Sequence, residues 1–418
     1  MLAAVGALVG LLRALGQPPR AIPLRGNATL GYYFATALVG SERQPQPLIV
    51  DTGSYITAFG CADCVGCGRH WQPLFDWRRS ASFRNASAAE ERLGWRCEAA
   101  AEGGCPFRQG YAEGSAYTGR YVEDRFVFEN ETLRDAPEFT LVFGCAESET
   151  EQFLAQEVNG VLGLGARPPY CGAPPTVVEA ARLQNRAAVA QFSICLGHDG
   201  GRLRLGAVNA ELRLPGARER IIRPKAQPWR VFYAVPLTGI AVGGQRLRWG
   251  FDRLAPATDQ AFFDTGATLT YLPLELHGLW VAAFGTFCAA KAGRCGGTGE
   301  YRACYELPGP DRQAFLRSFP NVTFTFGDVD YAWMAQDYLV GEATQTCVGV
   351  QAARDLVLGA SFMRNYDITF DLSTQTVGFV RADCAGTGEV WPVTDNPHAG
   401  AALPIALAGL FLILLLLR

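Results

Sequence analysis

Short runs of apolar and β-branched residues, separated by Gly, Pro, Asn and Asp, fill most of this chain. Sustained helical periodicity is almost absent, and the runs at 31–39, 140–143 and 367–371 have the composition of strands. Helices are expected at 176–184 and 273–284. The pattern therefore predicts an all-β architecture with few helices.

An internal repeat divides this pattern into two halves. The segment LIVDTGS, which begins at Leu48, returns as AFFDTGA from Ala261. Each copy is followed much later by two apolar residues and a glycine, which end at Gly163 and Gly359. Two lobes of similar plan fit easily into 418 residues. The predicted domains are an N-terminal lobe at 30–207, a linker region at 208–230 and a C-terminal lobe at 231–385.

Both ends of the chain are apolar. Residues 1–16 have the pattern of a secretory signal peptide, and the leader at 17–29 is too short for an inhibitory prosegment. A polar stalk at 386–398 precedes an apolar run at 399–417, which is long enough to cross a bilayer. The last run is interpreted either as a transmembrane helix or as the removable tail of a lipid-anchor signal. Both interpretations predict a membrane-attached protein whose bulk is lumenal.

Composition and charge indicate the cellular compartment and exclude one class of partner. Thirteen cysteines and four glycosylation sequons favour an oxidising compartment of the secretory pathway. The endoplasmic reticulum is favoured, with the cell surface as the alternative. Lysine and arginine number 37 against 40 acidic residues, so no basic surface for nucleic acid is expected. The candidate glycosylation sites are Asn27, Asn85, Asn130 and Asn321.

The repeated Asp-Thr-Gly predicts a pair of catalytic carboxyl groups, Asp51 and Asp264. Two carboxyl groups in contact share one proton because both cannot ionise together. The ionised group can take a proton from a bound water while the other polarises a peptide carbonyl. We expect the glycines to allow close backbone approach and the threonine hydroxyls to bond into the opposite loop. The predicted supporting residues are Thr52, Gly53, Ser54, Thr265 and Gly266.

These motifs resemble those of the pepsin-like aspartic proteases over residues 30–383. The segment at 357–371 resembles that family's signature of the last lobe, and Tyr111 matches the tyrosine of its flap. The resemblance implies a bilobal fold with an active-site cleft between two β-rich lobes, closed by a mobile hairpin. It also implies an aspartic endopeptidase that acts on proteins or peptides as a monomer, without cofactor or metal. The predicted flap and substrate-binding residues are Tyr111, Glu113 and Gly114.

A narrower resemblance follows the first aspartate. The cysteine-rich segment at 61–70, the PLFD at 73–76 and the flap sequence YAEGS are similar to those of the plasmepsin V group. Its members are membrane-anchored enzymes of the endoplasmic reticulum that cut exported proteins after an arginine-containing motif. Pepsins carry a tryptophan where this chain has Ala58, and the plasmepsin V group has a small residue there. Glu113 lies two residues after Tyr111, so its carboxylate is expected over the bound peptide, where it could bind a substrate arginine; the alternative is a solvated charge on the hairpin.

The cysteines allow two interpretations. Cys61, Cys64 and Cys67, with His70 beyond, have a spacing compatible with a metal site, but an oxidising lumen favours disulfides. Cys97 and Cys105 lie close downstream as candidate partners of these three. An odd total leaves at least one thiol free or paired between chains. Family resemblance implies two further disulfides, Cys145 with Cys195 and Cys304 with Cys347.

Three alternative functions follow from the same residues. A catalytically inactive relative could act as a binding or inhibitor protein, although both aspartates are present. A lipid-anchored surface protease of broader specificity is a second alternative. A serine hydrolase is poorly supported because the chain has no Gly-x-Ser-x-Gly motif and only four histidines.

Overall fold

Short β-strands dominate the structure, a computed structural model, and the all-β prediction is confirmed. Contacts along the chain group it into two compact units, unit 1 with 21–235, 261–270 and 357–390, and unit 2 with 236–260 and 271–356. The structure describes residues 21–86, 93, 95–97, 104–129, 138–168, 172–223, 232–250, 260–290, 295–309, 311–341, 344–388 and 390.

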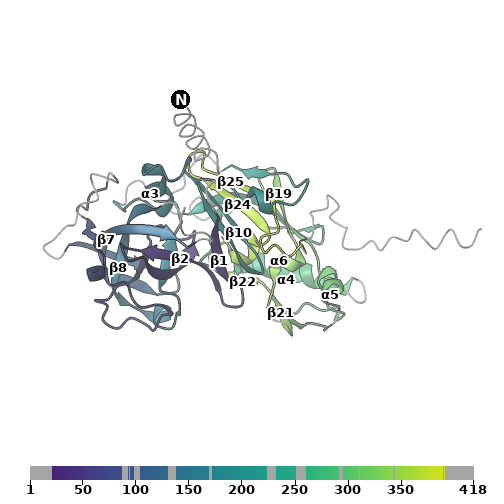
Figure 1. Cartoon of the computed structure of the whole chain (residues 1–418). Coiled ribbons are helices and arrows are strands. Elements are labelled where there is room, and N and C mark those ends of the chain that lie inside the picture. Colours follow the sequence, from purple (N-terminus) through teal and green to yellow (C-terminus); the bar gives the residue numbers. More distant parts are fainter. Residues whose placement is uncertain are drawn as a thin grey trace, which may run out of the picture. The chain divides into compact units, whose positions relative to one another are not determined.

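Unit 1 is built on a 14-stranded sheet, in which β7 and β8 are the long strands at the left of Figure 1. The second Asp-Thr-Gly belongs to this unit, so both motifs lie in one compact body. The lobe boundaries predicted from the repeat stay a prediction. In spatial order the strands are β12 (Arg220–Ile222), β25 (Thr376–Arg381), β24 (Tyr366–Asp371), β10 (Gln191–Leu196), β11 (Asp199–Leu205), β1 (Ile22–Asn27), β2 (Tyr32–Val39), β3 (Gln44–Asp51), β9 (Gly160–Gly163), β4 (Ala58–Gly60), β8 (Phe139–Glu149), β7 (Ala116–Phe128) and β5 (Arg84–Asn85), with β6 (Cys105–Gly110) paired to β7.

The sequence explains why β3 occupies the centre of this sheet. Its last six residues are all buried, which fits the apolar run that leads into the first Asp-Thr-Gly. It pairs antiparallel with β2 on one side and parallel with β9 on the other. Strands buried on both faces read as continuous apolar runs rather than as alternating ones.

Unit 2 contains strands of two sheets. From Leu237 onward β13 (Tyr233–Val242) pairs with β18 (Val322–Phe326) and β14 (Gln245–Arg246), and β18 pairs with β19 (Val329–Trp333). The second sheet is β17 (Cys304–Glu306), β21 (Gln345–Val348) and β20 (Leu339–Gly341). Strands β16 (Thr270–Pro273) and β22 (Val350–Ala353) pair with each other, and the helices include α5 (Arg312–Arg317) and α6 (Ala335–Tyr338).

Both predicted helices are present. Helix α3 (Val177–Leu183) begins after a capping box, in which the Thr176 hydroxyl accepts from the backbone of Glu179 and the Glu179 carboxylate accepts from the backbone of Thr176. Helix α4 (Leu274–Ala289) continues five residues beyond its predicted end at 284. The extra turn buries Cys288, which forms a disulfide.

Six disulfides join the described cysteines, and two predicted pairings are wrong. Cys145 bonds Cys61 rather than Cys195, because β4 and β8 run side by side and the register places Phe59 opposite Cys145. Cys195 bonds Cys384 instead. Cys97 and Cys105 bond each other rather than the cysteines at 61–67. The remaining bonds are Cys64–Cys67, Cys288–Cys295 and Cys304–Cys347, the last as the resemblance implied, and Cys171 lies outside the described residues.

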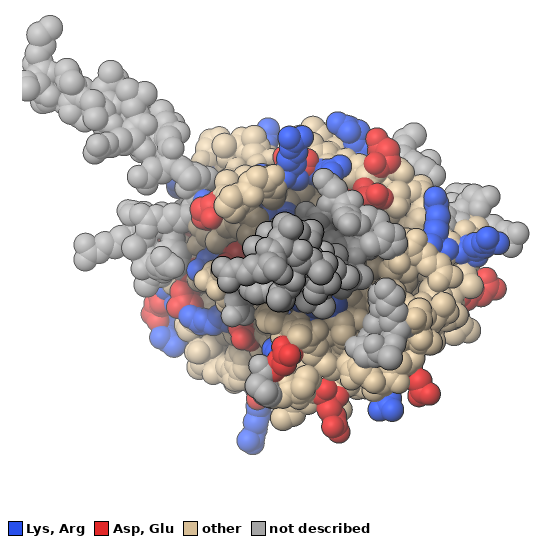
Figure 2. Space-filling model, turned by 90° about the vertical axis from the view of Figure 1, so that its right-hand side faces the viewer, with Lys and Arg blue, Asp and Glu red and all other residues tan. Residues whose placement is uncertain are grey.

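Charged side chains of both signs alternate on the face shown in Figure 2, where the coloured residues form no continuous basic area. In the ranges that the structure describes, no helix has the length and apolar character needed to span a bilayer. The predicted signal peptide at 1–16 and the predicted anchor at 399–417 lie outside those ranges.

Candidate active site

The two Asp-Thr-Gly motifs leave equivalent strands in unit 1. Asp51 ends β3, which runs parallel to β9 with Asp51 opposite Gly163. Asp264 follows β15 (Gln260–Phe263), which runs parallel to β23 (Val357–Leu358). Each apolar strand therefore pairs with the apolar-apolar-Gly segment of its own half of the repeat.

The two motifs are tied together by their threonines, both of which are fully buried. The backbone N–H of Thr52 donates to the Thr265 hydroxyl at 3.0 Å, and the N–H of Thr265 donates to the Thr52 hydroxyl at the same distance. Each hydroxyl in turn donates to a carbonyl of the opposite strand, Thr52 to Phe263 at 2.9 Å and Thr265 to Val50 at 2.7 Å. Four reciprocal bonds therefore fix the spacing of the two loops.

The glycines of the motifs leave room for the carboxyl groups. A Cβ atom on Gly53 would lie 2.6 Å from the carboxyl carbon of Asp264, and one on Gly266 would lie 2.6 Å from Oδ1 of Asp51. Each glycine N–H also donates to the carboxylate of its own motif, at 2.8 Å for Asp51 and 2.9 Å for Asp264. Any larger residue at either position would push the carboxyl groups out of this arrangement.

The carboxyl groups of Asp51 and Asp264 form a hydrogen bond with each other but differ in their surroundings. Burial raises the pKa of Asp51, while the Ser54 hydroxyl, which donates to its Oδ2 at 2.5 Å, opposes that rise. Burial and the charge of Asp51 hold the pKa of Asp264 well above its usual range. Ala267 offers Asp264 only its backbone N–H, at 3.3 Å. The proton that the pair shares therefore belongs mainly to Asp264.

A β-hairpin brings a tyrosine to this pair. Strands β6 and β7 close at the pair Gly110–Ala116, and the N–H of Tyr111 donates to the carbonyl of Ser115 at 2.9 Å. Gly114 has a φ of +101°, which favours glycine at the tip of the turn. Burial and the charge of Asp51 raise the pKa of Tyr111 well above its usual value, and the Ser54 hydroxyl lies close enough to lower it in part.

The chain is similar to known proteins over most of the described residues. Residues 33–207 match the family model described as xylanase inhibitor N-terminal, and residues 232–381 match xylanase inhibitor C-terminal. Aspartic protease 5 of Toxoplasma gondii is 27% identical over 376 residues, 84% of this chain. Aspartic proteinase nepenthesin-2 of Nepenthes gracilis is 23% identical over 369 residues, which is 85% of this chain and 79% of nepenthesin-2.

The chain belongs to the pepsin-like aspartic protease family. Plasmepsin V of Plasmodium falciparum is 28% identical, but over only 191 residues, 45% of this chain. The chain spans about a third of the length of the first curated relatives that it matches, 36% of aspartic protease 5 and 32% of plasmepsin V.

One departure from pepsins changes the surroundings of Tyr111. Ala58, at the position of the pepsin tryptophan, is fully buried and has no group to bond a hydroxyl. Phe153, in the short helix η4 (Glu151–Leu154), packs edge-on against the Tyr111 ring, with ring centroids 5.1 Å apart, and stacks on Tyr117. Sequence reasoning missed Phe153 and Tyr117, because nothing in their local pattern distinguishes them from ordinary core aromatics.

The cysteines and the histidine that were considered as metal ligands form other contacts. Cys61, Cys64 and Cys67 all form disulfides, and His70 bonds Glu149. Among the described residues no group of three or more His, Cys, Asp or Glu side chains is arranged to hold a metal ion. Glu113 is exposed beside Gly114 at the tip of the hairpin.

Proposed function

We propose that this protein is an aspartic endopeptidase in which Asp51 and Asp264 activate a water molecule. The observation that carries the proposal is the mutual contact of the two carboxyl groups, each cradled by a glycine and held by the crossed threonine bonds. Their unequal surroundings supply one ionised and one protonated carboxyl group at the same pH, which this hydrolysis requires.

The chemistry follows from the position of the shared proton. Asp51, stabilised as the anion by Ser54 and Gly53, takes a proton from the attacking water. Asp264 transfers its proton to the peptide carbonyl oxygen as the water adds, which gives a neutral tetrahedral diol. Asp51 then carries the proton that protonates the departing amine, and Asp264 recovers its own when the carbonyl re-forms.

The test of this function is cleavage of a peptide library by the purified chain, with and without a statine-type inhibitor. Such an inhibitor mimics the tetrahedral intermediate and binds an aspartic dyad far more tightly than a substrate does. Cleavage that the inhibitor abolishes supports the proposal. Cleavage that the inhibitor leaves unchanged would assign the activity to another mechanism.

A catalytically inactive inhibitor is the second candidate, because both matching family models are described as xylanase inhibitors. The buried contact between the two carboxyl groups argues for catalysis, since an inhibitor has no need to keep a buried pair of acids. Tight binding of the statine-type inhibitor by a chain that cleaves no peptide would favour this second candidate.

We infer a preference for arginine near the cleaved bond from the position of Glu113. Its carboxylate stands at the exposed tip of the hairpin, two residues from Tyr111, where a guanidinium could bind with two hydrogen bonds. Glu113→Ala should lower kcat/KM for arginine-containing peptides about 10- to 100-fold, with little change for peptides that lack arginine. Glu113→Gln, which keeps the size of the side chain, is the matched control for charge. An unchanged cleavage profile in both variants would contradict the preference.

The pH optimum should depend on Ala267. Ala267→Thr would place a hydroxyl where it can donate to ionised Asp264, as Ser54 does for Asp51. Because a hydrogen bond to the anion lowers a carboxyl pKa, the alkaline limb of kcat/KM should move toward acid by about one pH unit. Ala267→Val is the control, since it has the same shape without the hydroxyl. Equal profiles for the two variants, or a move toward alkali, would contradict the prediction.

We further propose that the protease works in the lumen of the secretory pathway, attached to a membrane, with the endoplasmic reticulum favoured. The six disulfides support an oxidising compartment. Asn85 is exposed and Asn27 and Asn321 are partly exposed, so these three sequons are accessible to glycosylation, and Asn130 lies outside the described residues. We also propose that the protease processes secretory-pathway proteins and is related to the plasmepsin V group.

A further inference from the structure

A buried histidine joins two acceptors near the hairpin. Nδ1 of His70 lies 2.9 Å from the carbonyl oxygen of Gln156, and Nε2 lies 3.1 Å from Oε2 of Glu149. A carbonyl can only accept, so Nδ1 carries a hydrogen. The second bond then needs another proton, on Nε2 or on the carboxyl group, because a bare nitrogen and a carboxylate would face each other with lone pairs.

This contact is closed to solvent. The side chains of His70 and Glu149 are 1% and 0% exposed, and the N–H of Gly68 also donates to Oε2 of Glu149, at 3.0 Å. Burial lowers the pKa of His70, but the hydrogen bond and the charge of Glu149 outweigh burial and raise the pKa above 6.5. The imidazole of His70 therefore keeps its second proton to a higher pH than an ordinary histidine does.

The histidine spans the segment that supports the hairpin tip. Glu149 and Gln156 are the two ends of this segment, 149–156, so one imidazole ring ties both ends. Within it, the N–H of Thr150 donates to the carbonyl of Ala116 at 3.1 Å, and the N–H of Gln152 donates to the Ser115 hydroxyl at 3.2 Å.

The same segment also contacts the flap tyrosine, through the edge-on contact of Phe153 with the Tyr111 ring. Glu149 itself lies opposite Tyr117 in the register of β7 and β8. Any movement of 149–156 would therefore reach both the backbone at the hairpin tip and the aromatic ring that faces Asp51.

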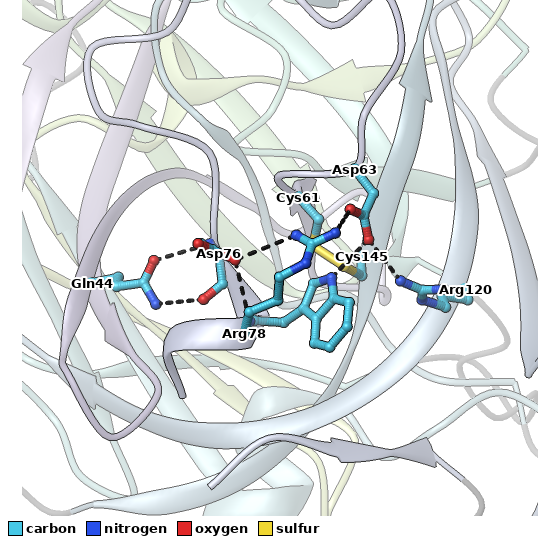
Figure 3. A network of polar contacts seen from close by, with 8 residues as sticks. Gln44, Cys61, Asp63, Asp76, Arg78, Arg120 and Cys145 are labelled. Atoms are coloured by element: carbon cyan, nitrogen blue, oxygen red, sulfur yellow. Dashed lines mark hydrogen bonds and ion pairs between the residues drawn. A yellow bond between two sulfur atoms is a disulfide. The ribbon is translucent and has the colours of Figure 1, made fainter. Parts of the chain in front are cut away.

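The loop that carries His70 is anchored at its start, as Figure 3 shows. The Cys61–Cys145 disulfide joins it to β8. Asp63 accepts from Nε1 of Trp77 at 2.7 Å and from Arg120 of β7 at 3.1 Å, and it also pairs with Arg78. Because the loop is fixed at this base, a change at His70 should displace the segment 149–156 rather than the loop.

In the described part of the chain, backbone groups of three residues form hydrogen bonds with the pair. Gln156 and Val158 contribute backbone hydrogen bonds to His70, and Gly68 contributes one to Glu149. The titratable groups nearby are Tyr117 on β7 and, through it, Tyr111 and Glu113 at the hairpin tip. Both tyrosines have pKa values raised well above 10.0, so neither titrates in the range of a histidine.

We propose that His70 and Glu149 form a proton-dependent brace that positions the hairpin tip over the two aspartates. Both are positioning residues, because neither touches the reacting groups. With the proton bound, the brace holds 149–156 and thereby Tyr111. When the proton leaves, the bond between Nε2 and Oε2 is lost and the tip is released. Any effect of the brace on catalysis rests on the proposed function. The pH-dependent motion of the hairpin does not depend on it.

The test is amide hydrogen exchange of the hairpin peptide 105–117 in the full chain, measured by mass spectrometry from about pH 6 to about pH 9. Protection is the chemical exchange rate of the unstructured peptide at each pH divided by the measured exchange rate. In wild type, protection should fall about tenfold or more on the alkaline side. In Glu149→Gln the amide can donate to a neutral imidazole, so protection should stay level with pH. His70→Gln removes the titrating group and should also abolish the alkaline fall, at lower overall protection.

The matched control is His198→Gln, because His198 is a half-exposed histidine 3.8 Å from the carboxylate of Asp199 and lies outside the segment 149–156. It should behave as wild type. A wild-type alkaline fall that persists in Glu149→Gln and His70→Gln, or no fall in wild type, would overturn the brace. A chain that cleaves nothing but whose hairpin responds as described would contradict the proposed function and leave the brace intact. A protease that cleaves but whose hairpin does not respond would contradict the brace alone.

Discussion

Asp264→Asn should lower kcat/KM by about four orders of magnitude or more while the chain stays folded. An amide cannot hold the proton that the two carboxyl groups share, so the peptide carbonyl loses its acid. Steady-state kinetics on a cleaved peptide give the loss, and circular dichroism shows whether the fold is kept. Asp199→Asn, at an exposed aspartate of the same unit, is the control.

The same variant should be more stable than wild type at neutral pH. Burial and the charge of Asp51 raise the pKa of Asp264 above its ordinary value of 3.8. A carboxyl group that holds its proton more tightly in the folded state destabilises that state as pH rises from about 4 toward the folded pKa. Asparagine carries no such penalty, so the gain in Tm should vanish below about pH 4. Substantial turnover by well-folded Asp264→Asn, or a lower Tm at neutral pH, would contradict the assignment of this residue.

Thr265→Val should be the second most damaging change. Valine keeps the shape but removes the hydroxyl that accepts from Thr52 and donates to Val50. Two buried backbone groups would be left without partners, at a cost of about 2–4 kcal/mol in the free energy of unfolding. Because the crossed bonds fix the spacing of the aspartates, kcat/KM should also fall about 100-fold.

Thr270→Val separates these two effects. Thr270 is equally buried, but its hydroxyl lies 3.4 Å from that of Ser361, outside the crossed threonine bonds. It should lose stability in denaturant unfolding without a comparable loss of kcat/KM. If Thr265→Val and Thr270→Val lost activity equally, the crossed bonds would have no special part in catalysis.

The repeat was sufficient to predict two equivalent motifs whose threonine hydroxyls bond into the opposite loop, as observed. The later apolar-apolar-Gly segments were visible as part of the repeat, but their parallel pairing with the apolar strands, β3–β9 and β15–β23, was not predicted. The short strands and both helices were equally accessible, because their signals are local.

The partners of single side chains were not predictable in the same way. Cys145 finds Cys61 only because β4 lies beside β8, and 84 residues separate the two cysteines in sequence. His70 and Glu149 are 79 residues apart, and neither stands in a pattern that indicates the other. Pairings of this kind depend on register and on the course of loops, which a single sequence does not encode locally.

The disulfide between Cys195 and Cys384 bridges 189 residues, and Asp264 lies within that span while Asp51 lies before it. A single cut of the backbone between 196 and 263 would therefore leave two polypeptides, each bearing one of the two aspartates, still covalently joined. Such a nicked form would migrate as one species until it is reduced. Electrophoresis without reductant cannot report whether the protein is one chain or two, and both forms would keep the aspartates tethered in the same body.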